Sequence, residues 1–112
     1  MEIAVIGGQL IIDKKVYAKE MMVKNSFLKT LLQLRPSHPA STLNISKDAS
    51  LVYIDYNGSS GVLLETDYQK FFQDFKSKYG SSVKGRLTIQ TNWFNSFISV
   101  VDLNTDEVKV IT

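Results

Sequence analysis

The chain has 112 residues, of which 44% are hydrophobic and 21% are charged, and its formal net charge is +2. This length and composition predict one folded domain over residues 1–112 and exclude a disordered, charge-rich chain. Because the sequence contains no cysteine, disulfides, thiolate metal sites and cysteine nucleophiles are excluded as well.

The N-terminal region is rich in residues that favour strands. Glu2 to Ile6 and Gln9 to Ile12 read as two strands, and Gly7-Gly8 between them can form a tight hairpin turn. The next run, Lys15 to Lys24, alternates imperfectly between polar and apolar residues, and we expect a third strand there. The short apolar run at the N-terminus is typical of neither a signal peptide nor a membrane span, which predicts a cytoplasmic protein without a membrane partner.

A helix and a group of strands are predicted next. Asn25 or Ser26 can cap a short helix that Pro36 ends, and its apolar residues share one broad face: Phe27, Leu28, Leu31, Leu32 and Leu34. The runs Leu43 to Ser46 and Leu51 to Tyr56 then predict two strands. The turn residues Asn57 to Gly61 predict a hairpin into Val62-Leu63-Leu64.

The best-defined helix follows Thr66. Thr66 and Gln69 form a capping box, and Gly80 marks the end of the helix. Between them, aromatic residues recur every three or four positions and so fall on one side: Tyr68, Phe71, Phe72, Phe75 and Tyr79. This face is expected to pack on the core.

Three strands are predicted to close the chain as an antiparallel meander, at Arg86 to Thr91, Phe94 to Asp102 and Glu107 to Ile111. The predicted fold class is therefore α+β, an antiparallel sheet packed by two amphipathic helices. The order of elements also suggests a pseudo-duplication, in which a helix followed by a meander occurs twice.

No catalytic motif accompanies these elements. His38 is the only histidine, and no Gly-x-Ser-x-Gly sequence is present to pair with it. Asp55-Tyr56-Asn57-Gly58 resembles the start of a calcium loop, but its glycine and the later Glu65 fall at the wrong positions. We therefore expect no enzyme activity, no cofactor and no metal site.

Basic residues gather in the second half of the chain, beside aromatic residues. Lysines can neutralise phosphates while exposed rings stack on bases, which suits a nucleic acid or a nucleotide. The same lysines also fit the solvent face of an amphipathic helix, so both interpretations stay open. The candidate ligand-binding residues are Lys70, Lys76, Lys78, Lys84, Arg86, Trp93 and Phe94.

The last strands carry little charge, and an uncharged strand at a sheet edge can pair with another chain. The primary functional prediction is thus a small binding module, such as an accessory or inhibitor protein, that associates with a protein partner or with itself as a homo-oligomer. If the N-terminal strand pairs with the last strand, this edge is hidden instead. The candidate interface residues are Phe97, Ser99, Val101, Val108 and Val110.

Overall fold

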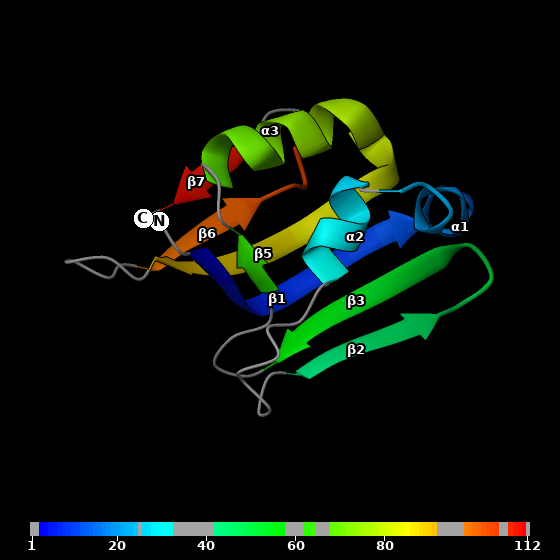
Figure 1. Ribbon diagram of the computed structural model, residues 1–112, viewed down its shortest axis with the longest axis horizontal. Helices are drawn as coiled ribbons and strands as arrows, with labels where there is room; N and C mark the ends of the chain where they lie inside the picture. The colour runs from blue at the N-terminus through cyan, green and yellow to red at the C-terminus, as the bar shows by residue number, and fades with distance from the viewer. Residues whose placement is uncertain are drawn as a thin grey trace.

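A computed structural model describes residues 3–24, 26–32, 42–57, 62–64, 68–91, 98–105 and 108–111. Within these residues the strands form one sheet in which every neighbouring pair is antiparallel (Figure 1). Its order is β2-β3-β1-β5-β6-β7, and β4 also pairs with β1. The strands are β1 (Ile3–Asp13), β2 (Thr42–Lys47), β3 (Leu51–Asn57), β4 (Val62–Leu64), β5 (Val83–Thr91), β6 (Ile98–Asp102) and β7 (Lys109–Ile111).

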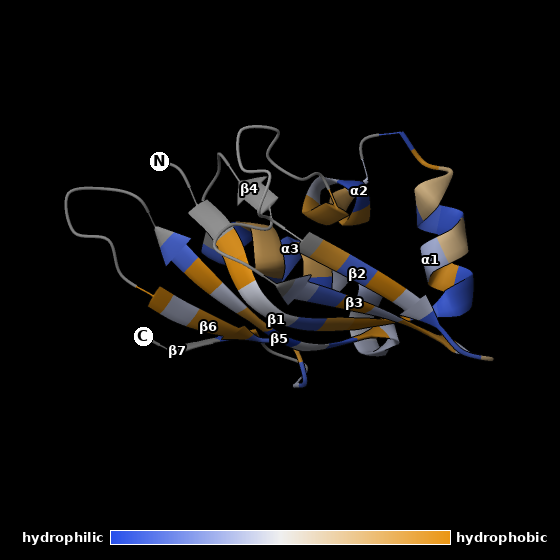
Figure 2. Cartoon of the chain, turned by 90° about the horizontal axis from the view of Figure 1, so that it is seen from below, coloured by the Kyte–Doolittle hydropathy of each residue, from blue (hydrophilic) through white to orange (hydrophobic). Residues whose placement is uncertain are grey.

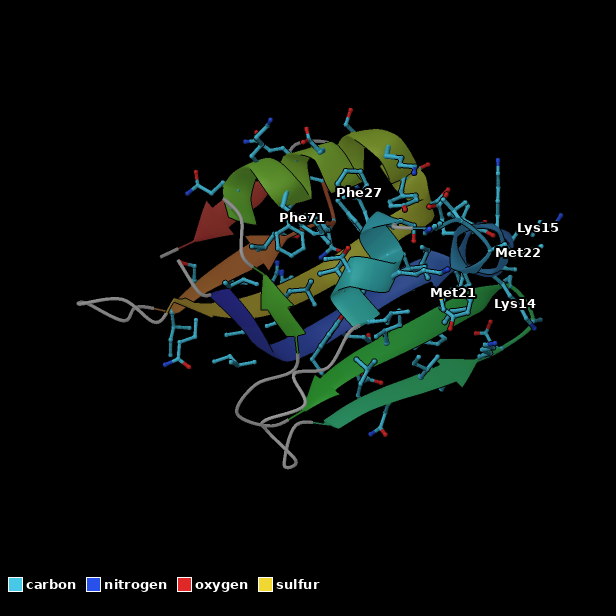
Figure 3. The ribbon with its side chains drawn as sticks, in the orientation of Figure 1. Lys14, Lys15, Met21, Met22, Phe27 and Phe71 are labelled. Atoms are coloured by element: carbon cyan, nitrogen blue, oxygen red, sulfur yellow. The ribbon has the colours of Figure 1, made fainter. Side chains whose placement is uncertain are left out.

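Helices cover one face of the sheet. They are α1 (Lys14–Met21), α2 (Phe27–Leu32) and α3 (Tyr68–Tyr79), and a 3-10 turn at Gly80–Ser82 follows α3. Figure 2 shows α1 and α2 on the same side of the strands, and the rings of Phe27 in α2 and Phe71 in α3 pack edge to face, with centroids 5.4 Å apart (Figure 3). The predicted α+β class is confirmed, although the described residues contain three helices where two were expected.

The core lies between the helices and the inner side of the sheet. Phe72 and Phe75 of α3 are fully buried, as are Leu87 and Ile89 of β5. The aromatic face that the sequence predicts for α3 is therefore confirmed for Phe71, Phe72, Phe75 and Tyr79, whose side chains all belong to the core. Burial of such rings, each worth about 2 kcal/mol, is what holds α3 on the sheet.

β1 is one continuous strand, so the predicted hairpin at Gly7-Gly8 is wrong. The strand lies at the centre of the sheet, with β5 on one edge and both β3 and β4 on the other. The glycines instead directly follow a β-bulge, since the register to β5 shifts between Val5 and Gly7 and leaves Ile6 as the extra residue, while Gly7 and Gly8 pair with Thr88 and Leu87. A bulge inserts one residue without reversing the chain, and glycine is common in bulges and turns alike.

The strand predicted over Lys15 to Lys24 is also wrong, because this segment contains α1. Asp13 caps the helix, and its carboxylate accepts a hydrogen bond from the backbone N–H of Lys15. Glu20 is buried, and Tyr17 and Met21 pack against the core. The spacing of four residues from Tyr17 to Met21 is typical of a helix. The polar residues between them also give an imperfect alternation, which resembles the pattern of a strand.

The predictions for α2 and for the β2–β3 hairpin are confirmed. The hydroxyl of Ser26 accepts a hydrogen bond from the N–H of Lys29, as an N-cap does. The hairpin closes with a hydrogen bond of 3.0 Å from the N–H of Asp48 to the carbonyl of Leu51. Pro36, predicted to end α2, and Thr66, predicted to begin α3, lie outside the described residues.

The predicted hairpin between β3 and β4 is wrong. Both strands run antiparallel to β1 and pair with the same side of it, β3 with Gly8 to Asp13 and β4 with Ile3 to Val5. β4 therefore runs in the same direction as β3, and the pseudo-duplication of a helix and a meander is not confirmed. The C-terminal meander β5-β6-β7 is confirmed by its antiparallel pairings.

Candidate interaction surface

The sheet has an outer face, which we define as the face opposite the helices. In β5 the side chains of Val83, Leu87 and Ile89 are buried, and successive side chains of a strand point to opposite faces. Residues directly opposite one another on paired strands share a face, so the register extends this assignment across the sheet. The outer face then includes Gln9, Ile11, Tyr53, Asp55, Lys84, Arg86, Thr88, Ile98, Val100 and Asp102.

A row of paired polar groups crosses the outer face. The side-chain amide of Gln9 donates a hydrogen bond of 2.9 Å to Asp55, and Arg86 forms an ion pair with Asp102, with Nε and Oδ2 3.3 Å apart. Gln9 and Arg86 lie directly opposite each other, so the two pairs follow one line across β3, β1, β5 and β6. These pairings account for the carboxylates in the row, and they give the centre of the face a polar strip.

Asp102 is held in its charged form. Its carboxylate accepts a hydrogen bond from the backbone N–H of Asn104 at 2.9 Å, and this bond, with the nearby Arg86, lowers the pKa of Asp102 below its usual value. A carboxylate whose pKa is lower in the folded state stabilises the fold fully above its unfolded pKa of about 3.9 and loses this effect as the pH falls through the folded value.

We expect this linkage to appear in acid. Between about pH 5 and about pH 3 the wild type should lose more stability than the Asp102→Asn variant, because the variant has no carboxylate to protonate there. Urea titrations of both proteins across this range measure the difference. Parallel losses in the two proteins would show that Asp102 is not protonated differently in the folded and unfolded states.

Two hollows open near the ends of the strands. One, of about 240 Å³, lies at the border of the outer face and is lined by Ile11, Asp13, Leu51, Tyr53, Ser81, Ser82 and Lys84. The other, of about 520 Å³, lies where α1 begins, beside the β2–β3 hairpin, and includes Lys14 and Lys15 (Figure 3). In the second hollow the ammonium group of Lys14 donates to the carbonyl of Asp48 at 3.1 Å, which ties α1 to the hairpin.

The predicted basic residues do not share one surface. Lys70 and Lys78 are on α3, whereas Lys84 and Arg86 are on the outer face of the sheet. The core and the sheet separate the two groups. Lys76 is only 5% exposed, and its ammonium group donates to the carbonyls of Val83 and Leu103, so its place on a ligand-binding surface is wrong. Trp93 and Phe94 lie outside the described residues.

A buried carboxylate, which the sequence analysis missed, joins α1 to α3. The hydroxyl of Tyr79 donates a hydrogen bond of 2.7 Å to Glu20, and Nζ of Lys78 lies 3.4 Å from the same oxygen. Burial, and then the bond to Glu20, raise the pKa of Tyr79. The pattern of residues 15–24 predicts a strand, so it gives no sign that Glu20 is buried against α3. The cluster is a structural tie, in which each charged or polar group has a partner.

The predicted interface residues are also redistributed. Ser99 and Val101 are buried on the inner side of β6, so the prediction that they form an interface is wrong. Val108 is partly buried against the core, and Phe97 and the side chain of Val110 are outside the described residues. Their neighbour Ile98 points outward instead and is 56% exposed.

β7 lies at one end of the strand order and β2 at the other, and β1 pairs with neither. The expected alternative, in which the N-terminal strand covers the last strand, is therefore wrong. Ile45 on β2 is 41% exposed, so the described sheet carries exposed isoleucines on β2 and on β6. Ile98 shares the outer face with the paired charges, whereas Ile45 lies at the β2 edge on the inner face. Exposed apolar side chains of this kind suit an association surface.

The fold and its surfaces thus define a class, an α+β protein whose antiparallel sheet carries the described helices on one face only. Comparisons with family models, with curated proteins and with solved structures found no match. The helices within the described residues are too short or too polar to cross a bilayer. In the same part of the chain no three His, Asp or Glu side chains come together as metal ligands would. His38 and Glu65 lie outside it.

Proposed function

We propose that this protein is a non-enzymatic binding module that associates with protein, including a second copy of itself, through the parts of its sheet that the helices leave uncovered. The observation that carries the proposal is the open sheet with exposed Ile45 and Ile98. In the free protein each of these isoleucines leaves apolar surface in contact with water. A partner that covered one of them would contribute about 1 to 2 kcal/mol to the free energy of binding.

The polar groups of the outer face support a binding role. Asp55 and Asp102 each have a partner within the face, and Tyr53 donates a hydrogen bond of 3.0 Å to Asp48. Groups paired in this way are held in fixed orientations, and fixed polar groups can orient a docked surface. An accessory or inhibitor role, in which the protein occupies a partner, follows from such a surface.

The test is the molar mass of the purified protein in solution. We expect size-exclusion chromatography with light scattering to show a mass that rises with concentration between about 1 µM and about 500 µM, the range in which small interfaces associate. Raising the salt concentration should change this little if apolar contacts dominate. A protein that remains monomeric throughout, and that no added partner protein binds, would contradict the proposal.

A phosphate-bearing ligand, either a nucleic acid or a nucleotide, is the second candidate. One observation favours it: Lys84 is exposed beside the 240 Å³ hollow, so an ammonium group and two serines, Ser81 and Ser82, border one small concavity, together with the carboxylate of Asp13. Titrating the fluorescence of Trp93 with oligonucleotides and nucleotides tests this. Quenching that weakens as salt is raised supports phosphate binding, and no quenching removes the candidate.

A further inference from the structure

β2 has the properties of a strand that can accept another strand. It lies at the end of the sheet, with no described strand beyond it (Figure 1). Its six residues pair with β3 in an unbroken register from Thr42 to Lys47, so no bulge twists its edge away. Lys47, at one end, is its only charged residue. Natural edges are usually blocked by bulges, proline or central charges, and β2 has none of these.

The backbone groups on the outer edge of β2 can be assigned. The N–H of Asp48 donates to the carbonyl of Leu51, which makes these two a hydrogen-bonded pair of the β2–β3 ladder. Hydrogen-bonded pairs recur at every second residue of an antiparallel ladder. Asn44 and Ser46 therefore bond toward β3, and the N–H and C=O groups of Leu43, Ile45 and Lys47 point away from it.

An apolar row of side chains also stops at this edge. Leu10 of β1 lies opposite Ile54 of β3, and Ile54 lies opposite Ile45 of β2, so the three share the inner face. Leu10 and Ile54 are fully buried, whereas Ile45 is 41% exposed. The row thus reaches the boundary of the molecule with an isoleucine half uncovered, where one more strand would complete its burial.

We infer that two copies of the chain join their sheets by pairing β2 with β2, antiparallel, about a twofold axis at Ile45. The inference rests on the proposed function and names its partner and surface. In this register Ile45 faces Ile45 of the second copy, and Leu43 faces Lys47 of the second copy. All three outward residues then form hydrogen-bonded pairs, giving about six backbone hydrogen bonds across the dimer.

The pattern of side chains favours this register over its neighbours. The two Lys47 positions lie about 14 Å apart along the strands, four residues at about 3.4 Å each, so no like charges are opposed. The Lys47 ammonium group already lies 5.0 Å from the ring centroid of Tyr17, which directs it toward α1. If the pairing were shifted by two residues, one of the three outward residues of each β2 strand would lie beyond the end of the other β2 strand and would have no partner.

The opposite edge is less suited to this pairing. β7 has three residues, Lys109–Ile111, half the length of β2. Short edge strands present few backbone groups to a partner and are one of the devices that limit edge pairing. Because strand pairing of six residues covers a small area, the dimer is expected to dissociate in the micromolar range.

The first experiment compares two matched variants by sedimentation or light scattering. I45K places like charges directly opposite each other at the twofold axis and should weaken the dimer by about tenfold or more. I98K makes the same change at another exposed isoleucine and should alter the dissociation constant by less than about twofold. Circular dichroism checks that both variants are folded.

The second experiment reads the register directly. Because the chain has no cysteine, I45C introduces a single thiol. Mild oxidation should give a disulfide-linked dimer, since paired Cα atoms about 5.5 Å apart lie within disulfide range. K47C should not link to itself. Without any substitution, the amide protons of Leu43, Ile45 and Lys47 should exchange more slowly as concentration rises, while those of Asn44 and Ser46 are protected at all concentrations.

The outcomes separate the inference from the function on which it rests. A protein that stays monomeric at every concentration overturns both. A dimer that I45K leaves intact, or whose edge amides stay unprotected, overturns the β2 pairing and leaves self-association through another surface, such as that of Ile98. A dimer weakened by I45K, linked through position 45 and protected at the three outward amides supports the pairing.

Discussion

Replacing Gly8 by alanine is expected to lower the free energy of unfolding by about 3 kcal/mol or more, a large part of the total stability of a domain of this size. Gly8 has a φ of +100°, a backbone conformation that residues with a side chain rarely adopt. A Cβ at this position would also lie 2.2 Å from the carbonyl oxygen of Arg86 on β5. Backbone strain and overpacking each cost about 1 to 3 kcal/mol, and here they act together.

The neighbouring glycine supplies the control. A Cβ at Gly7 would meet only Thr88, at 3.8 Å, which is ordinary van der Waals contact. Urea denaturation of G7A and G8A should therefore show a small change for the first and a large one for the second. Gly85 of β5 repeats the geometry of Gly8, with a φ of +120° and a Cβ position 2.1 Å from the carbonyl oxygen of Gln9. If G8A is as stable as the wild type, β1 and β5 do not approach this closely.

Replacing Lys76 by methionine is expected to cost about 2 to 4 kcal/mol of stability, since methionine keeps the apolar stem and removes the charged donor. The ammonium group lies 2.6 Å from the carbonyl oxygen of Val83 and 2.7 Å from that of Leu103. These bonds join α3 to the start of β5 and to the residue after β6. Without them, two backbone acceptors lose a charged partner in a site closed to water, and hydrogen bonds to charged groups are the stronger ones.

Lys70 on the same helix provides the comparison. It is exposed, and substitutions at surface positions usually change stability by less than about 0.5 kcal/mol. Thermal or urea unfolding of Lys76→Met and Lys70→Met should separate the two clearly. Equal stability of Lys76→Met and the wild type would mean that solvent reaches the two carbonyls and satisfies them.

Elements with a strong local pattern were predictable. In α3 the aromatic spacing predicts both the helix and its buried face, because a period of 3.6 residues places Phe71, Phe72 and Phe75 on one side. The β2–β3 hairpin and the C-terminal meander follow from short β-rich runs separated by turn residues. Such signals arise within about ten residues of sequence, so the rest of the fold does not need to be known.

Elements whose state depends on distant partners were not predictable. Gly7-Gly8 suits a turn or a bulge, and the choice depends on β1 being paired along both edges. Asp13 is an N-cap signal for α1, but the helix buries Glu20 only because Tyr79, distant in sequence, supplies a hydrogen bond. The direction of β4 likewise depends on a free stretch of β1 that no local pattern reveals.

The candidate surface shows the same division. Alternation predicts that Ser99 and Val101 share a face of β6, but only the packing of α3 shows that this face is the inner one and that Ile98 lies outside. Lys76 resembles any lysine of an amphipathic helix, and the two carbonyls that bind it come from β5 and from Leu103. The basic residues are close in sequence, yet the sheet places Lys84 and Arg86 on the opposite side from α3.

By itself, the sequence determined the class of this protein: a single α+β chain without cysteine chemistry, with an aromatic helix and several antiparallel strands. The tertiary structure decided the order of the strands, the faces of the sheet, and therefore which residues a partner can reach. The physical reason is that helical and strand periods are local properties of the backbone, whereas burial and edge position are set by contacts between segments far apart in the chain. β2 is one edge because β1, β3 and β5 fill the middle of the sheet.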